Sequence, residues 1–232
     1  MTTILNTHQP ALSGHYFVTG TDTEIGKTTT TANLVKALAE QGNSVYAIKP
    51  VTAGLESSDT GEPFSDDAKR INSFANVHPP IEAIAPIRLG TPCSPHIAAE
   101  IDGVTLTAEQ ITAVTQQTLQ DYPADTVLIE GAGGWFTPIN RTQTLADVAV
   151  ALNCPVIVVV GVKLGSLNHA MLTLQAVWQS GLEVALVVFN KLAADTPFFD
   201  EQVAWLCDYI SGEASQYQLV TPQFMSQDFL RC

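Results

Sequence analysis

A set of short apolar runs, which do not alternate between apolar and polar residues, limits the fold of this chain most strongly. The runs occupy residues 15–20, 44–51, 125–131, 155–162 and 184–190. They are rich in β-branched side chains and end in loops. Uninterrupted apolar strands are typical of a parallel sheet that is buried on both of its faces.

Stretches with helical spacing of apolar residues separate these runs. Helices are predicted over residues 28–41, 107–121 and 167–180. Strands that alternate with helices predict an α/β fold with a doubly wound, mostly parallel sheet and helices on both faces. We expect the 232 residues to form a single domain behind a flexible N-terminal extension over residues 1–14.

Ligands of doubly wound sheets bind outside the carboxyl ends of the strands. Four chemically useful positions end strands here, namely Gly20, Lys49, Glu130 and Asn190. We therefore expect them to converge on one edge of the sheet. The irregular stretch 52–91, which has a predicted helix near residues 66–75, is expected to be an insertion over this edge.

The segment GTDTEIGKTTTT, residues 20–31, nearly matches a phosphate-binding loop but has five neck residues where the usual pattern has four. A strand, a glycine loop and a helix turn backbone N–H groups toward one point, where the helix dipole adds about half a positive charge. Lys27 is expected to reach the β and γ phosphates and Thr28 to bind magnesium. A solvated turn is the alternative, but the order of elements favours a P-loop NTPase-like domain.

Glu130 and Lys49 add charge to the same edge. In EGAGGWFTP, Glu130 suits a second contact to magnesium, which prefers oxygen ligands, and the glycines that follow let the backbone approach a ligand. The alternative is a solvated glutamate on a glycine turn. The chain has only ten Lys and Arg, so a second lysine at this edge is meaningful and suits phosphoryl transfer, which needs positive charge held in place.

The segment SDDAKRI begins the predicted helix in the insertion. Ser65 or Asp66 could cap that helix, and Asp67 could turn inward toward the ligand edge. Helix capping and a metal role both remain open for the two aspartates.

The charge and hydropathy pattern argues against several classes of partner. The net charge of −13 would be repelled by nucleic acid and by anionic membranes, so neither is expected as a partner. The longest apolar stretch, 155–162, is too short to span a bilayer, and the N-terminus has no export pattern. We expect a soluble, cytoplasmic protein whose four cysteines, which lack metal-ligand spacing, are reduced thiols.

Six segments together carry a resemblance to a known family. They are YFVTGTDTEIGKT, KPVTAG, SDDA, TPCSPHIAA, EGAGGWFTP and VVGVKLGSLNHAMLT. In this order they resemble the dethiobiotin synthetases over residues 16–190, and the five-residue neck is that family's own form of the phosphate loop.

The resemblance implies a reaction. A homodimer with its active site at the interface would use ATP, magnesium and carbon dioxide to close a cyclic urea on 7,8-diaminopelargonate. One amine would take up carbon dioxide as a carbamate, which the γ-phosphoryl group of ATP activates as a carbamic-phosphoric anhydride. The neighbouring amine would then close the ring, giving dethiobiotin, ADP and phosphate.

The resemblance also implies roles for individual residues. The ATP-binding set is Glu24, Ile25, Gly26, Lys27, Thr28, Thr29, Asp67, Glu130, Gly131, Ala132, Gly133 and Asn190, with Asn190 at the adenine. The magnesium ligands are Thr28, Asp67 and Glu130. Lys27 and Lys49 are the catalytic residues, which stabilise the carbamate and the transferring phosphoryl group. The substrate-binding set is Thr23, Thr52, Ala53, Gly165, Ser166 and Leu167, with the last three acting across the dimer interface.

The chain departs from the family in two places. Ala53 stands where the family usually has Ser or Thr, so one hydroxyl contact to the substrate is missing, and Thr52 is the candidate to replace it. At the C-terminal end, Pro222 is a weak counterpart of the family's loop beside the base, which leaves base selectivity open. His96 and His169 lie in matched motifs and are expected to be buried and hydrogen-bonded, without a catalytic task.

Two other functions compete with this one. A partner-regulated ATPase switch of the partitioning type would share the sheet, but its loop usually carries a lysine where this chain has Asp22. A corrinoid amide ligase would share the nucleotide domain but needs an ammonia source, usually a second domain.

Overall fold

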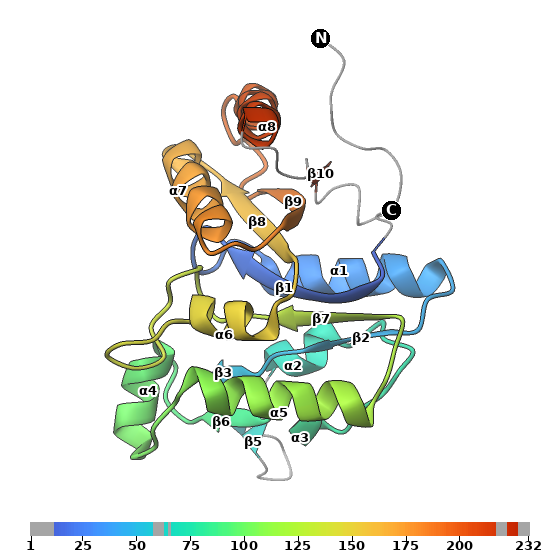
Figure 1. The fold of residues 1–232 in the computed structure, drawn as a ribbon, viewed down its shortest axis with the longest axis vertical. Helices are drawn as coiled ribbons and strands as arrows, with labels where there is room; N and C mark the ends of the chain where they lie inside the picture. Colours follow the sequence, from blue (N-terminus) through green and yellow to red (C-terminus); the bar gives the residue numbers. More distant parts are fainter. Residues whose placement is uncertain (1–11, 58–62, 65, 217–221, 227–232) are drawn as a thin grey trace.

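The computed structural model describes residues 12–57, 63–64, 66–216 and 222–226. Its centre is a six-stranded sheet with the strand order β10-β9-β8-β1-β7-β2 (Figure 1). The strands are β1 Gly14–Gly20, β2 Val45–Ile48, β7 Thr126–Glu130, β8 Val156–Val162, β9 Val184–Lys191 and β10 Gln223–Ser226. Every pair in this sheet is parallel, which confirms the predicted α/β class.

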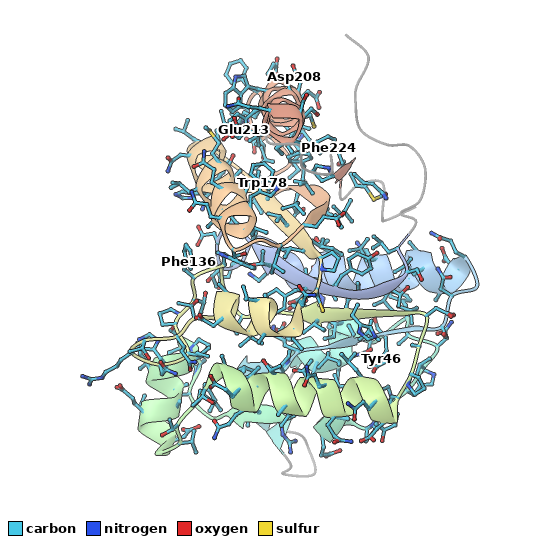
Figure 2. All side chains as sticks on the ribbon, in the orientation of Figure 1. Tyr46, Phe136, Trp178, Asp208, Glu213 and Phe224 are labelled. Atoms are coloured by element: carbon cyan, nitrogen blue, oxygen red, sulfur yellow. The ribbon has the colours of Figure 1, made fainter. Side chains whose placement is uncertain are left out.

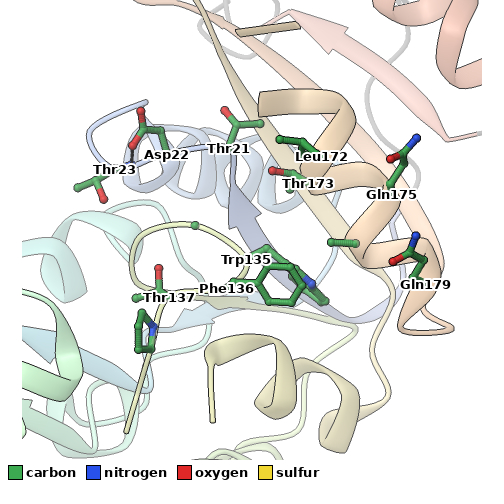
Figure 3. A pocket seen from close by; sticks show the side chains of 13 residues that line it. Thr21, Asp22, Thr23, Trp135, Phe136, Thr137, Leu172, Thr173, Gln175 and Gln179 are labelled. Atoms are coloured by element: carbon green, nitrogen blue, oxygen red, sulfur yellow. Dashed lines mark hydrogen bonds between the residues drawn. The ribbon is translucent and has the colours of Figure 1, made fainter. Parts of the chain in front are cut away.

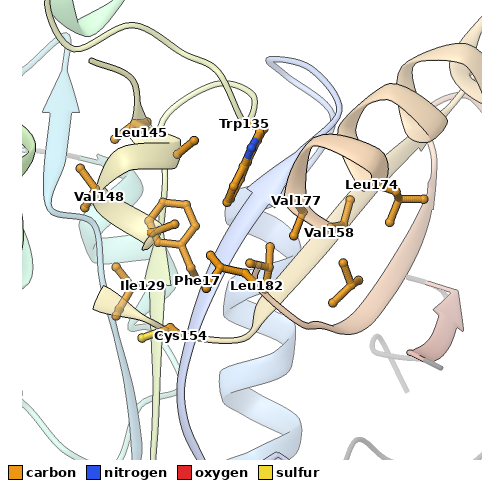
Figure 4. Packing of buried hydrophobic residues seen from close by; sticks show 14 of the residues in the cluster. Phe17, Ile129, Trp135, Leu145, Val148, Cys154, Val158, Leu174, Val177 and Leu182 are labelled. Atoms are coloured by element: carbon orange, nitrogen blue, oxygen red, sulfur yellow. The ribbon is translucent and has the colours of Figure 1, made fainter. Parts of the chain in front are cut away.

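Both faces of the sheet are buried, because neighbouring residues of one strand join different cores. In β7, Ile129 packs in the cluster that contains Phe17 and Val158 (Figure 4), whereas Leu128 packs in the cluster that contains Val18. All five residues are at most 1% exposed. This two-sided burial explains why the strands carry uninterrupted apolar sequence instead of alternation.

Helices cover both faces, as predicted. Apolar residues of α1 (Lys27–Glu40), α2 (Asp66–Ile71) and α3 (Ile81–Ile84) belong to the cluster of Leu128. Those of α4 (Pro95–Asp102), α5 (Ala108–Asp121), α6 (Leu145–Leu152), α7 (Ser166–Gln179) and α8 (Phe199–Gln216) belong to the cluster of Ile129. The α1, α5 and α7 bounds lie within one residue of the sequence predictions.

The predicted strand 44–51 is divided in two. β2 ends at Ile48, the backbone N–H of Lys49 donates to the Ile84 carbonyl (2.8 Å), and the chain passes Pro50 into β3 (Val51–Ala53). β3 pairs in parallel with β6 (Ile87–Leu89), and β4 (Glu56–Ser57) pairs with β5 (Pro63–Phe64) outside the main sheet. Lys49 therefore lies in the bend between two strands.

The helix predicted over 66–75 ends at Ile71, because the side chain of the next residue, Asn72, hydrogen-bonds to the backbone of the edge strand β2. The Asn72 side chain accepts from Ala47 N–H (2.9 Å) and donates to the Ala47 carbonyl (2.8 Å). These bonds pair the outer edge of β2, whose backbone groups would otherwise lack partners on that side.

Part of the predicted N-terminal extension belongs to the fold. β1 begins at Gly14, Leu12 is 4% exposed, and its carbonyl accepts a bond from the Thr126 hydroxyl (3.0 Å). Residues 1–11 lie outside the described part, and the assignment of the whole chain to one domain remains a prediction. Among the described helices, none is both long and apolar enough for a membrane span. Cys93, Cys154 and Cys207 are free thiols, as predicted, and Cys232 lies outside the described residues.

Candidate active site

The phosphate loop follows β1 and gives way to α1 at Lys27. Gly26, the residue before the helix, has φ 87°, a left-handed conformation that glycine adopts without steric cost. Glycine has no side chain to cap the helix, so the first N–H groups of α1 remain available to an anion. This local geometry agrees with the predicted P-loop arrangement.

Ile25, the fifth neck residue, anchors the loop to the sheet. It is 1% exposed, and its side chain fills space that two glycines leave open. A Cβ on Gly20 would lie 2.7 Å from Ile25 Cδ1, and one on Gly161 would lie 2.6 Å from Ile25 Cγ2. The Asn190 Nδ2 donates to the Ile25 carbonyl at 2.6 Å. The extra neck residue therefore has a physical role, which is to pin the loop onto the ends of β1, β8 and β9.

The ammonium group of Lys27 bends back across the neck and donates to the Asp22 carbonyl at 2.9 Å. Burial lowers the pKa of Lys27 to about 8, although the charge of Glu130 acts in the opposite direction. The Asp22 carboxylate accepts from the Thr23 N–H (2.8 Å) and from Lys163 Nζ (3.1 Å), which lower its pKa. Asp22 thus holds the neck together, a role that the sequence analysis did not foresee.

Glu130 is the buried centre of the site. Its carboxylate is fully buried; Oε1 accepts from Thr28 Oγ1 (2.9 Å) and Lys49 Nζ (3.1 Å), and Oε2 accepts from Thr31 Oγ1 (2.6 Å). Lys49 Nζ also pairs with the Asp67 carboxylate. Burial lowers the pKa of Lys49, but Glu130 and Asp67 outweigh it, so the net pKa is raised and the ammonium stays charged.

Thr28, Asp67 and Glu130 form an oxygen-only donor set that fits magnesium. Thr28 and Glu130 are in direct contact, and Lys49 bridges Glu130 to Asp67. Magnesium is usually bound by one or two carboxylates together with waters and substrate phosphates, so two carboxylates and a hydroxyl suffice. The contact with Lys49 shows that Asp67 turns inward, and its role as a metal ligand stays a prediction.

A cavity of about 760 Å³ opens beside this cluster, and we call it the phosphate-loop cavity. Its lining contains the predicted residues Thr23, Glu24, Gly26, Lys27, Thr28, Thr29, Lys49, Ala53, Asp67, Ala132 and Gly133. It also contains Val51, Arg70, Pro92, Cys93, Ser94, Pro95, Thr137 and Pro138, which the sequence analysis did not select. Residues from five separate segments of the chain, 23–29, 49–53, 67–70, 92–95 and 132–138, thus meet at the carboxyl edge of the sheet.

Thr52, the candidate to replace the hydroxyl that Ala53 lacks, does not line this cavity. It is 3% exposed and its Oγ1 lies 3.5 Å from the Ile87 carbonyl, within the β3–β6 pair. Adjacent strand residues point to opposite sides, so Thr52 faces away from the cavity that Ala53 lines, and its substrate role stays a prediction without support from this geometry. Hydroxyl groups on the cavity wall come from other residues, including Ser94 and Thr137.

The remaining predicted residues lie around the cavity or away from it. Glu130 is fully buried and is not among the residues that line the cavity, while Gly131 donates its N–H to the Val18 carbonyl (2.9 Å). The Asn190 amide is 7% exposed and bonded to the loop, so its predicted contact with adenine stays a prediction. Residues 165–167, at the start of α7, do not line the cavity of their own chain.

The two histidines differ from expectation. His169 is exposed on α7, so the prediction that it is buried is wrong. His96 is half-buried, and its Nδ1 lies 3.0 Å from Ser94 Oγ, which confirms the hydrogen bond predicted for it.

The sequence analysis missed two residues that hydrogen-bond to predicted site residues, Thr31 to Glu130 and Arg70 to Thr29. The spacing of the sequence held a signal for both. Thr31 lies three residues after Thr28 on α1, and positions three apart share one face of a helix. Arg70 lies three residues after Asp67 on α2, by the same rule. Applied to each predicted site residue, this rule would have brought both into the site.

Comparisons with known proteins agree with this geometry. A model of the AAA domain family matches residues 14–217. ATP-dependent dethiobiotin synthetase BioD of Pseudescherichia vulneris is 42% identical over 195 residues, which are 84% of this chain and 80% of that protein. Chloroplast FtsY from Physcomitrella patens has a TM-score of 0.50 at 17% identity, over 90% of this chain and 60% of that one. This chain thus spans about three fifths of that structure, whose likeness shows the fold alone.

We expect Gly161→Ala to weaken nucleotide binding, because its new methyl group would displace Ile25 and with it the phosphate loop. Overpacking of this kind costs about 1–3 kcal/mol, so the dissociation constant for ADP should rise roughly tenfold in a titration. Gly212→Ala is the matched control, since nothing lies within 4 Å of its added Cβ in α8. Unchanged affinity of Gly161→Ala would mean that the loop does not depend on this close contact.

Proposed function

The chain belongs to the AAA-domain family and, within it, to the dethiobiotin synthetases, and we propose that it closes a cyclic urea on 7,8-diaminopelargonate with carbon dioxide. It is an ATP-dependent ligase of biotin biosynthesis. The acceptor amine, carbon dioxide and magnesium are our inference. This proposal rests on the position of the Lys49 ammonium, which lies between the Glu130 and Asp67 carboxylates beside a phosphate loop.

The residues of this chain have distinct tasks in the proposed reaction. The N–H groups at the start of α1 and the Lys27 ammonium bind the triphosphate, whose negative charge matches the positive end of the helix. Lys49 is oriented by its two carboxylate partners and offers its positive charge to the carbamate and to the phosphoryl group in transfer. Fixed charge of this kind is the main contribution of a protein to phosphoryl transfer.

Magnesium would be held by Thr28, Asp67 and Glu130, and it would neutralise charge on the β and γ phosphates. The cavity walls add selectivity. Val51, Ala53 and Pro92 are apolar, and Thr23, Ser94 and Thr137 supply hydroxyl groups.

Family membership argues against both competing functions. The relative that is 42% identical over most of the chain is a synthetase. The phosphate loop of this chain carries Asp22 where the partitioning-type switches usually have a lysine. The ammonia-dependent ligase has no comparable support. A cytoplasmic location remains a prediction.

The substrate carboxylate would be bound by a second copy of the chain. Residues 165–167 begin a fourteen-residue helix whose N–H groups favour an anion, yet they lie outside the cavity of their own chain. Around them, large apolar side chains are exposed: Leu164 by 99%, Leu172 by 59% and Phe136, which is labelled in Figure 2, by 64%. Exposed apolar groups gathered in one region mark interaction surfaces.

A groove of about 740 Å³ supports the same proposal. It runs between α7 and the loops that follow β1 and β7 (Figure 3). Thr23 lines both this groove and the phosphate-loop cavity. A partner seated on α7 would therefore lie next to the bound substrate, and in a two-fold dimer each chain would complete the site of the other.

The first experiment measures phosphate release from ATP and the formation of dethiobiotin. We expect release to require both diaminopelargonate and bicarbonate, because the phosphoryl acceptor is the carbamate that they form. Each is omitted in turn, and the product is identified by mass spectrometry. Release that continues unchanged without either compound would refute the synthetase assignment.

We expect Lys49→Ala to lower turnover by at least about 100-fold, the usual cost of removing one preorganised charge-stabilising group. The same change leaves the buried Glu130 carboxylate without its cation, so the denaturation midpoint should also fall. Lys49→Arg separates the two effects. It keeps the ion pair and should restore stability but not turnover, since the guanidinium has a different shape. Near-normal turnover of the alanine variant would remove the catalytic role.

We expect Leu164→Asp with Leu172→Asp to give a monomer that has lost turnover but still binds ADP, because the phosphate-loop cavity is built within one chain. Sedimentation and nucleotide titration measure the two properties. Ile101→Asp is the control, since Ile101 is equally apolar and 61% exposed on α4, away from α7. A wild-type chain that is monomeric at full turnover would contradict the dimer proposal.

A further inference from the structure

Arg70 reaches from the insertion to the phosphate loop. It lies on α2, and its Nη2 donates to the Thr29 hydroxyl on α1 at 2.9 Å. Arg70 and Thr29 both line the phosphate-loop cavity together with Lys27 and Lys49. The guanidinium is therefore a third cationic group at this cavity, in a chain with only ten Lys and Arg.

The charges at the cavity show why this group matters. Lys49 is matched by two carboxylates, and Lys27 is held by a backbone carbonyl. Among the described residues, no carboxylate forms an ion pair with Arg70. Its charge is accordingly not neutralised by the described part of the site, and a guanidinium offers several further N–H donors. A polyphosphate suits this guanidinium, because its N–H donors lie in one plane and can bond two phosphate oxygens at once.

We propose that Arg70 binds a phosphate oxygen of the nucleotide, with the Thr29 hydroxyl fixing the orientation of its guanidinium. The identity of the nucleotide rests on the proposed function. Through Arg70, the insertion contributes directly to ATP binding. α2 thereby has two tasks, because Asp67, one helical turn before Arg70, orients Lys49.

One other anion could use the same guanidinium, namely the carboxylate of the substrate. The position of Arg70 favours the phosphate, since its contact, Thr29, lies in the first turn of α1, directly after the phosphate loop. The experiment distinguishes the two ligands by whether the affinity for the nucleotide or the KM for the substrate changes.

The experiment compares Arg70→Ala and Arg70→Lys with the wild-type protein in titrations of ADP, ATP and inorganic tripolyphosphate, without substrate. We expect the alanine variant to bind each about tenfold more weakly, as for the loss of a hydrogen bond to a charged group. The lysine variant should lie between the two. Because Arg70 is exposed, the difference should shrink as salt is raised. Arg141→Ala removes the same charge from a side chain that is 91% exposed and should change nothing.

Two results would overturn the proposal. One is unchanged nucleotide and tripolyphosphate affinity in Arg70→Ala. The other is a higher KM for diaminopelargonate with unchanged nucleotide affinity, which would assign Arg70 to the substrate carboxylate. Since the titrations contain no substrate, they report on Arg70 even if the ring-closure assay fails. Failure of the proposed function is thus distinguishable from failure of this inference.

Discussion

Glu130 is a fully buried carboxylate at the end of β7, the strand next to the edge strand β2, and much of the site follows from the need to compensate its charge. An unpaired buried charge costs several kcal/mol, so its oxygens must have partners. α1 supplies Thr28 and Thr31, and the bend after β2 supplies Lys49. The cluster therefore fixes α1 against the sheet edge and orients the groups that meet the phosphates.

A second, apolar constraint shapes the loop itself. Ile25 fits against Gly20 and Gly161, and a methyl group on either glycine would collide with it. The polar cluster holds the C-terminal side of the loop and the apolar contact holds the neck. Between them, the N–H groups at the start of α1 stay directed at one point. A rigid loop of this kind binds phosphate without first having to be ordered.

The sequence alone was enough to predict the features that depend on local pattern. Apolar strands without alternation predicted two buried faces, and the position of Glu130 at the end of a strand predicted its place at the ligand edge. The sequence was not enough where a tertiary contact decides the outcome. Asn72 leaves its helix to pair with β2, and Thr52 turns into the β3–β6 pair. No periodicity in the chain reports such contacts.

The proposed division of the site between two chains follows from where its parts lie in the fold. The nucleotide half is assembled from α1, α2 and the strand ends, all within one chain. The start of α7, which suits the substrate carboxylate, lies outside that cavity among exposed apolar side chains. In the proposed dimer, ATP binding would be a property of the single chain, whereas ring closure would need the second copy. This division would tie catalysis to assembly without any separate regulatory element.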